Sequence, residues 1–224
     1  MLIEDTTSIY AGETSIKKVY LGDEVVYQKE EPIPYTPLEY LESNGNQRIN
    51  TGYSYTSNNA TIKTKFIHYN DKNTSKAVFG AYNNDNGYMT VATLYNGYYF
   101  VSNKTPINSL RYTFNTEHEL EIYVEGNSSK TGSYSIYENK SIIASGTGVG
   151  EITPYSLYLF TQNNAGSPET PGTHSRIYYL QMYDNLVLVR DFIPVLDTNN
   201  VPCMYDKVTK TFFYNIGTGT FLYG

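Results

Sequence analysis

The stretch that decides the fold is Arg176–Asp197, RIYYLQMYDNLVLVRDFIPVLD, which is dense in Ile, Leu, Val, Tyr and Phe. These residue types favour a pleated, half-buried sheet surface, and the turn-forming pair Asp184-Asn185 separates two such runs. Pro194 has no N–H to donate, so the second strand is expected to end there or to lie at a sheet edge. Neither run alternates strictly between polar and apolar residues. The stretch therefore predicts a strand pair deep in a sheet with both faces largely covered.

Short runs of strand-forming residues recur from Leu38 onward with turn residues between them, and no segment has a helical period. Strands at this spacing are typical of antiparallel sandwiches and jelly rolls. We therefore predict an all-β fold, a two-sheet antiparallel jelly-roll sandwich. Residues 162–173 are expected to form its longest structureless loop. The predicted strands are residues 47–53, 60–68, 77–82, 88–95, 98–103, 118–125, 133–138, 141–145, 155–161, 174–183, 186–195, 203–206 and 210–214.

The N-terminal part is predicted to be organised separately. Residues 1–31 contain two short strand-like runs on either side of Leu21-Gly22-Asp23, which indicates a hairpin. A lone hairpin is marginally stable in water, so we expect this segment to dock on the main domain or on another protein. Residues 32–37 hold three prolines and predict a stiff connector outside any sheet. The predicted domain is then residues 38–224.

Composition excludes several partners. The net charge of −6 argues against nucleic acid, which would require a clustered basic face. No apolar run approaches the roughly 20 residues of a membrane helix, so no membrane association is expected. The N-terminus lacks the basic and apolar regions of a signal peptide, which predicts synthesis in a cytoplasm. The single cysteine, Cys203, forms no internal disulfide and is expected to serve as a small hydrophobic residue.

Tyrosine is the outstanding bias, with 25 tyrosines and no tryptophan. Asn86-Gly87 and Asn96-Gly97 are strong hairpin signals and predict a meander in which Tyr95 faces Tyr98 and Tyr82 faces Val91. One face of this meander is aliphatic and the other is rich in tyrosine. The tyrosine face is the predicted ligand site unless the second sheet or a neighbouring subunit covers it. Its candidate residues are Tyr82, Asn83, Asp85, Tyr95, Asn96 and Tyr98.

Glutamates in the strand HELEIYVE are candidate acids. Glu119, Glu121 and Glu125 share one face, and neighbours on that face lie about 7 Å apart, a separation that suits an inverting glycosidase. However, Leu120, Ile122 and Val124 fill the other face, so strict alternation explains the glutamates as a solvated face. No catalytic residue is predicted.

Metal and cofactor signals are weak. Residues 83–87, NNDNG, form an oxygen-rich loop that could hold calcium, but the further acids of an EF-hand are missing and a turn explains it. The three histidines, His68, His118 and His174, are scattered without metal-ligand spacing. We predict no metal site and no cofactor, with calcium in this loop as the one exception to test.

Two stretches at the ends of residues 38–224 carry a family resemblance. The residues of these stretches are Leu38–Gly45, Gln47, Ile49 and Thr51-Gly52-Tyr53, then Leu188–Val195, Tyr205-Asp206-Lys207, Phe213-Tyr214-Asn215 and Gly217–Phe221. This pattern resembles the LamG-like (concanavalin-like) jelly-roll modules of phage and prophage minor structural proteins, tail or head fibres, from gut bacteria. The departures are Asn50, where the family often has Asp, and Cys203-Met204, where Gly-Leu is common.

The resemblance implies a place on a virion, with residues 1–31 docking on other virion proteins and the sandwich binding host-surface or mucosal glycan. Homo-oligomers are compatible with this role. The resemblance supplies no catalytic residue, and Arg190-Asp191 is expected to be an ion pair that stabilises the fold. Two alternatives stay open: a ligand-free decoration or fibre subunit of the capsid or tail, and a glycan hydrolase.

Overall fold

The computed structural model describes residues 9–11, 14–16, 18–28, 34–69, 77–83, 88–89, 93–95, 98–100, 106–111 and 113–224. The chain divides into two compact units, Met1–Pro34 and Tyr35–Gly224. In the first unit, β3 (Lys18–Leu21) and β4 (Glu24–Gln28) pair antiparallel around Gly22-Asp23, as the hairpin signal predicted. A further pair, β1 (Ile9–Ala11) with β2 (Thr14–Ile16), was not predicted.

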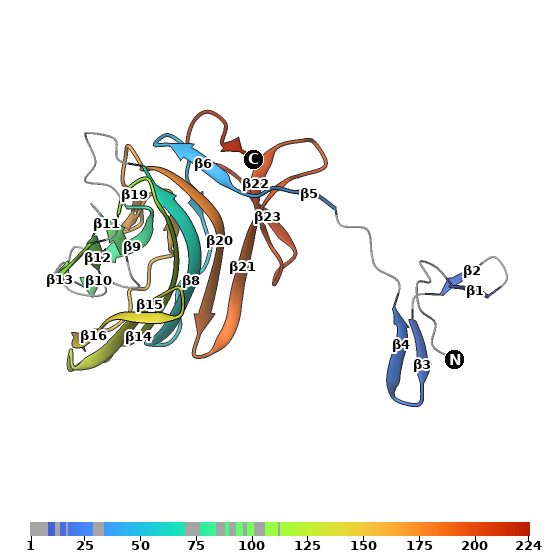
Figure 1. Cartoon of the computed structure of the whole chain (residues 1–224), viewed down its shortest axis with the longest axis horizontal. Coiled ribbons are helices and arrows are strands. Elements are labelled where there is room, and N and C mark those ends of the chain that lie inside the picture. The colour runs from blue at the N-terminus through green and yellow to red at the C-terminus, as the bar shows by residue number, and fades with distance from the viewer. Residues whose placement is uncertain are drawn as a thin grey trace. The chain divides into compact units, whose positions relative to one another are not determined.

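The second unit is built on one large sheet, in the strand order β16-β15-β14-β8-β20-β21-β22-β23 (Figure 1). The stretch Arg176–Asp197 supplies its middle, because β20 lies between β8 and β21. The strands are β8 (Asn59–His68), β14 (Glu117–Glu125), β15 (Gly132–Glu138), β16 (Ser141–Val149), β20 (His174–Asp184), β21 (Val187–Leu196), β22 (Pro202–Asp206) and β23 (Thr211–Phe213), joined by β5 (Thr36–Pro37), β6 (Leu41–Asn44) and β24 (Leu222–Tyr223).

Two details of this stretch differ from expectation. The chain reverses at Asn185-Leu186, one residue later than predicted, since Asp184 still pairs with Val187. Strand β21 also continues through Pro194 to Leu196, paired with β22. The Pro194 carbonyl accepts a hydrogen bond from Leu38 N at 3.0 Å, on the side away from β22. A strand residue's N–H points the same way as its carbonyl, so the proline removes no bond from the β22 ladder.

A smaller sheet covers the other side of the core, in the order β19-β18-β9-β17-β7 with β10 on β9. The apolar cluster between the sheets includes Phe66, Phe79, Phe160 and Phe192, all fully buried. The predicted sandwich is therefore confirmed. The strands are β7 (Ile49–Asn50), β9 (Phe79–Asn83), β10 (Tyr88–Met89), β17 (Tyr158–Leu159), β18 (Asn163–Asn164) and β19 (Ser167–Pro168), and a separate sheet holds β11 (Thr93–Tyr95), β12 (Tyr98–Phe100) and β13 (Pro106–Arg111).

Three sequence expectations require correction. Residues 162–173 are not structureless: they contain β18 and β19, and Asn163 is buried with its side-chain amide donating a hydrogen bond to Ser156 O at 2.8 Å. Tyr95 does face Tyr98, but Tyr82 faces Met89 rather than Val91, because the connecting loop is longer than two residues. The tyrosine meander is also divided, with β10 on the smaller sheet and β11 and β12 in the separate one.

The predicted connector also belongs partly to the sandwich. Thr36 and Pro37 form β5 and pair with Leu196 and Val195 of β21. Tyr35 packs against a second apolar cluster of Val195, Cys203 and Tyr205 on the outer face of the sheet. A proline is tolerated there because β5 is a two-residue edge strand. Within the described ranges, the structure has no helix long and apolar enough to cross a membrane.

Candidate functional site

The outer face of the large sheet carries tyrosines and charged groups on its central strands. In β8 and β14 the even-numbered residues are buried, so the odd-numbered ones face outward. The strand register places Tyr123 of β14 opposite Thr61 of β8, which in turn faces Tyr183 of β20. One step along, Glu121 lies between Lys63 of β8 and Tyr137 of β15. The β14–β15 hairpin and two strands distant from it in sequence, β8 and β20, thus place three tyrosines on one surface.

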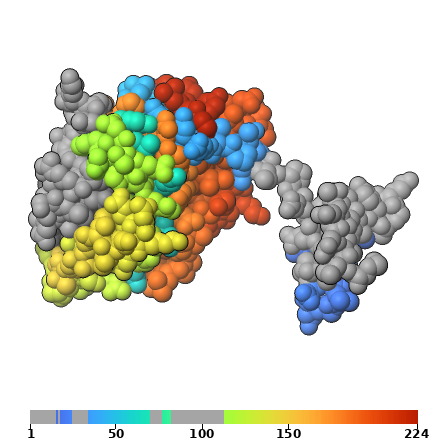
Figure 2. Space-filling model, in the orientation of Figure 1, coloured from blue at the N-terminus to red at the C-terminus, as the bar shows by residue number. Residues whose placement is uncertain are grey.

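A surface groove with a volume of about 630 Å³ follows these strands, and we call it the tyrosine groove. The rings of Tyr123 and Tyr137 meet edge to face with their centroids 5.6 Å apart. In the space-filling view, β15 and β16 (yellow) lie at the surface beside residues of the β14 segment (Figure 2). The groove is lined by Asn59, Thr61, Glu121, Tyr123, Glu125, Ser133, Tyr134, Ser135, Tyr137, Lys140 and Leu186. A smaller hollow of about 190 Å³ adjoins it and adds Lys63 and Tyr183.

Glu121 is the most strongly engaged polar group of the groove. Its Oε2 lies 2.9 Å from Lys63 Nζ and accepts a hydrogen bond from the Tyr123 hydroxyl at 2.7 Å. These two hydrogen bonds lower the pKa of Glu121, because both favour the ionised carboxylate. The Lys63 ammonium also lies 5.8 Å from the centre of the Tyr183 ring. Glu121 is therefore an ionised hydrogen-bond acceptor at neutral pH, held in one position.

The other two glutamates of HELEIYVE lie on the same outward face. Glu119 accepts a hydrogen bond from the Tyr179 hydroxyl at 2.9 Å. Glu125 accepts one from Ser133 Oγ at 3.3 Å, and it lines the groove beside Asn59. The predicted alternation is confirmed, since Leu120, Ile122 and Val124 are buried.

The site predicted from sequence falls largely outside the described residues. Residues 84–87 of the calcium-candidate loop, which include Asp85, lie outside the description, and so does Asn96. The backbones of Tyr82 and Asn83 lie in β9, Tyr95 in β11 and Tyr98 in β12, but their side chains are also outside the description. Over the part of the chain that is described, no group of three or more His, Cys, Asp or Glu side chains could hold a metal ion.

The tyrosine groove was missed at the sequence level. The alternation in HELEIYVE does place Tyr123 on the same face as the glutamates. It does not reveal which strands lie beside Tyr123. Tyr137 reaches the groove through the pairing of β14 with β15, and Tyr183 reaches the adjoining hollow through the pairing of β14 with β8 and of β8 with β20.

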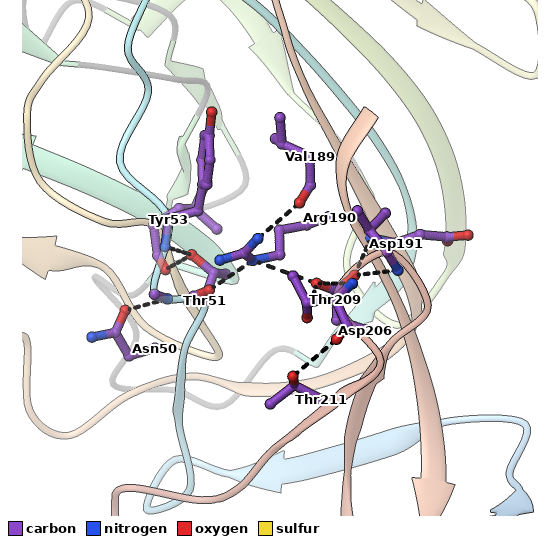
Figure 3. Close-up of polar contacts among 12 residues, drawn as sticks. Asn50, Thr51, Tyr53, Val189, Arg190, Asp191, Asp206, Thr209 and Thr211 are labelled. Carbon is purple, nitrogen blue, oxygen red and sulfur yellow. Dashed lines mark hydrogen bonds and ion pairs between the residues drawn. The ribbon is translucent and has the colours of Figure 1, made fainter. Parts of the chain in front are cut away.

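A second polar cluster is internal and structural (Figure 3). Arg190 donates to the carbonyls of Thr51 at 3.1 Å and Val189 at 2.8 Å, and its Nε lies 3.6 Å from the buried carboxylate of Asp206. Asp191 was expected from the sequence to pair with Arg190, but this is wrong: Asp191 pairs with Lys207, with its carboxylate 2.7 Å from Lys207 Nζ. Neighbouring strand residues point to opposite faces, so the two charges cannot meet. The fold-fixing contacts run from β21 to β22 instead.

Comparisons with known proteins bear on the fold. No family model matches the sequence, and no curated protein matches it. The structure is similar to a candidate carbohydrate-binding protein from Bacteroides ovatus, with a TM-score of 0.52 and 10% identity over 88% of this chain. The match spans 61% of that protein. At this identity the likeness shows a jelly-roll sandwich and nothing finer.

Two other solved structures are more distantly similar. One is a native heptameric SAP-like pentraxin from Limulus polyphemus, with a TM-score of 0.42 and 13% identity over 64% of this chain and 74% of that one. The other is the IT-sialidase CBM40 of Ruminococcus gnavus, with a TM-score of 0.23 and 15% identity over 69% of this chain and 90% of that one.

Proposed function

We propose that this chain is a glycan-binding module and that the tyrosine groove is its binding site. The observation that carries the proposal is the grouping of Tyr123, Tyr137 and the ionised Glu121 on an open face. Aromatic rings offer flat apolar surfaces to sugar rings, and a positioned carboxylate accepts hydrogen bonds from sugar hydroxyls. The similar Bacteroides ovatus protein, itself a candidate carbohydrate-binding protein, is consistent with this assignment.

We further propose that the module binds glycan without hydrolysing it. A general acid at a glycosidic bond needs a raised pKa, whereas the pKa of Glu121 is lowered by Lys63 and Tyr123. Glu121 is thus better suited to accept hydrogen bonds than to donate a proton.

The cellular setting of the proposal rests on the sequence resemblance. We propose an adhesin-type subunit of a phage or prophage particle, in which the hairpin of residues 1–31 docks on other virion proteins. Its groove would face host-surface or mucosal glycan. A ligand-free decoration or fibre subunit is the competing assignment.

A glycan array on the full chain, followed by titration of the best ligand, tests the proposal. Tyr123→Ala and Tyr137→Ala should each weaken binding roughly 10- to 100-fold, the range expected of central contact residues. Tyr178→Ala is the matched control, because Tyr178 lies on the same sheet against Lys65 and outside the groove. Its affinity should be unchanged.

The same array separates the competing assignments. Binding that is lost in Tyr95→Ala and Tyr98→Ala, but kept in Tyr123→Ala, would move the site to the face predicted from sequence. No binding to any glycan would favour the decoration subunit. Release of reducing sugar that Glu121→Gln abolishes would establish a hydrolase.

A further inference from the structure

Two hairpin tips border the tyrosine groove. Lys140 belongs to the β15–β16 turn and Leu186 to the β20–β21 turn, and both line the groove. In the sheet, β14 and β8 lie between these hairpins. Asn139 N donates to Glu119 O of β14 at 3.2 Å, and Asn185 N donates to Asn59 O of β8 at 2.8 Å. Each tip is therefore held against a central strand, at opposite ends of the groove.

Both tips have residues in the left-handed backbone region. The φ angles are +48° and +67° at Asn139 and Lys140, and +47° and +67° at Asn185 and Leu186. Two-residue turns of this kind favour Asn-Gly, because glycine adopts positive φ without a steric penalty. This chain has Asn-Gly at 86–87 and 96–97, yet it has lysine and leucine at these two tips. Turn geometry does not account for either side chain.

Burial does not account for Leu186 either. Its side chain is 77% exposed, and it stands outside both apolar clusters of the described core. The turn beneath it is rigidly held, since Asp184 accepts hydrogen bonds from Tyr53, Thr56 and Ser57. A strained residue that the fold does not require points to a role in function.

Resting on the proposed function, we infer that Leu186 sets the specificity of the groove for sugars that carry a methyl group. A methyl group removes apolar leucine surface from water, whereas the hydroxyl or hydroxymethyl group that the unmodified sugar carries at that position gains less there. Glu121 and Glu125 supply acceptors for the remaining hydroxyls of such a ring. The methyl group can belong to an N-acetyl substituent or to a 6-deoxy position, and both present the same chemistry to Leu186.

Paired sugars test the inference on the full chain. N-Acetylglucosamine is compared with glucose, and L-fucose with L-galactose, each as the same multivalent conjugate. The wild type should prefer the methyl-bearing member of one pair about tenfold, and the pair that shows the preference identifies the source of the methyl group. Leu186→Gly should abolish the preference while raising Tm by a few degrees, because it relieves the backbone strain.

Two further variants separate binding from strain. Leu186→Ala removes the side chain and keeps the strain, so it should abolish the preference without raising Tm. Lys210→Gly is the matched control, because Lys210 has φ +56° in an exposed turn away from the groove. It should raise Tm and leave the preference intact. A wild type that binds both members of each pair equally, or a Leu186→Gly variant that keeps the preference, overturns the inference and leaves the proposed function standing. A wild type that binds no glycan overturns the proposed function itself.

Discussion

Asp184, the last residue of β20, shows how much one side chain organises in this fold. Its carboxylate accepts hydrogen bonds from the Tyr53 hydroxyl at 2.8 Å, from Thr56 N and Oγ1 at 2.7 Å, and from Ser57 N at 3.2 Å and Oγ. Burial raises the pKa of Asp184, but the hydrogen bonds from residues 53–57 outweigh it and hold the pKa at about 2. The carboxylate therefore joins the segment before β8 to the β20–β21 hairpin.

Asp184→Asn should destabilise the fold by about 2 kcal/mol at pH 7, since one pKa unit corresponds to about 1.4 kcal/mol. The folded-state pKa is below the unfolded value, so this stabilisation is complete above about pH 4 and is lost as the pH falls towards 2. Urea denaturation of wild type and variant at pH 7, 4 and 2.5 measures the difference. A deficit that stays constant down to pH 2.5 would show that the charge of Asp184 is not what stabilises the loop.

At the scale of elements, an ion pair between the Arg190 guanidinium and the Asp206 carboxylate joins strands β21 and β22. Asp206 is fully buried and accepts hydrogen bonds from Asp191 N at 2.8 Å and Thr209 Oγ1 at 2.7 Å. Arg190 adds its positive charge and also reaches Thr51 before β8. These contacts tie β22 to the middle of the sheet, and they add polar constraints to a register that burial of apolar residues on both strands already favours.

Arg190→Met should cost about 3 kcal/mol in the free energy of unfolding, because the buried Asp206 carboxylate loses its cation. Lys207→Met is the matched control on the adjacent pair. Lys207 is exposed, so loss of its contact with Asp191 should cost no more than about 1 kcal/mol. Chemical denaturation of both variants measures the two losses in the free energy of unfolding. Equal losses would mean that burial of the Arg190–Asp206 pair adds nothing.

At the scale of the whole molecule, the sandwich includes a short segment ahead of its predicted start. Tyr35 packs on Tyr205 with ring centroids 4.5 Å apart and meets Phe212 edge to face at 6.5 Å. Cys203 is fully buried in the same cluster, and burial raises the pKa of its thiol to about 12. Residues 35–37 thus cover an apolar surface that the sheet alone would expose.

A chain that begins at Tyr35 should have the Tm of the full chain, whereas one that begins at Leu38 should melt several degrees lower, since it loses β5 and the Tyr35 ring. The thiol of Cys203 provides the readout. Labelling with a thiol reagent should be slow in the chain from Tyr35 and at least tenfold faster in the chain from Leu38, because a thiol reacts only when exposed and ionised. Equal labelling rates would show that Tyr35 does not cover the cluster.

Much of the architecture was predictable because its causes are local. The alternation in HELEIYVE predicts one strand and its buried face, and the apolar runs of Arg176–Asp197 predict two more; the structure confirms all three strands. The outer face of β20 is only half-buried, however, and not largely covered as predicted. Loop details were less predictable. The turn after β20 was predicted from Asp184-Asn185, but Leu186 at φ +67° was not, because leucine carries no preference for that conformation. The meander was predicted as one unit, whereas β10 pairs with β9 and β11 pairs with β12.

The sequence by itself determined an all-β sandwich and the strand hairpin at Arg176–Asp197, because residue propensity and alternation act over a few neighbours. The tertiary structure alone decided where the tyrosines gather. Tyr123 and Tyr137 come from successive strands, but Tyr183 joins their face only through the pairing of β14 with β8 and of β8 with β20, which are contacts distant in sequence. The same holds for Arg190, whose partner Asp206 lies across a strand pair and not at the next residue, since adjacent side chains on a strand point apart.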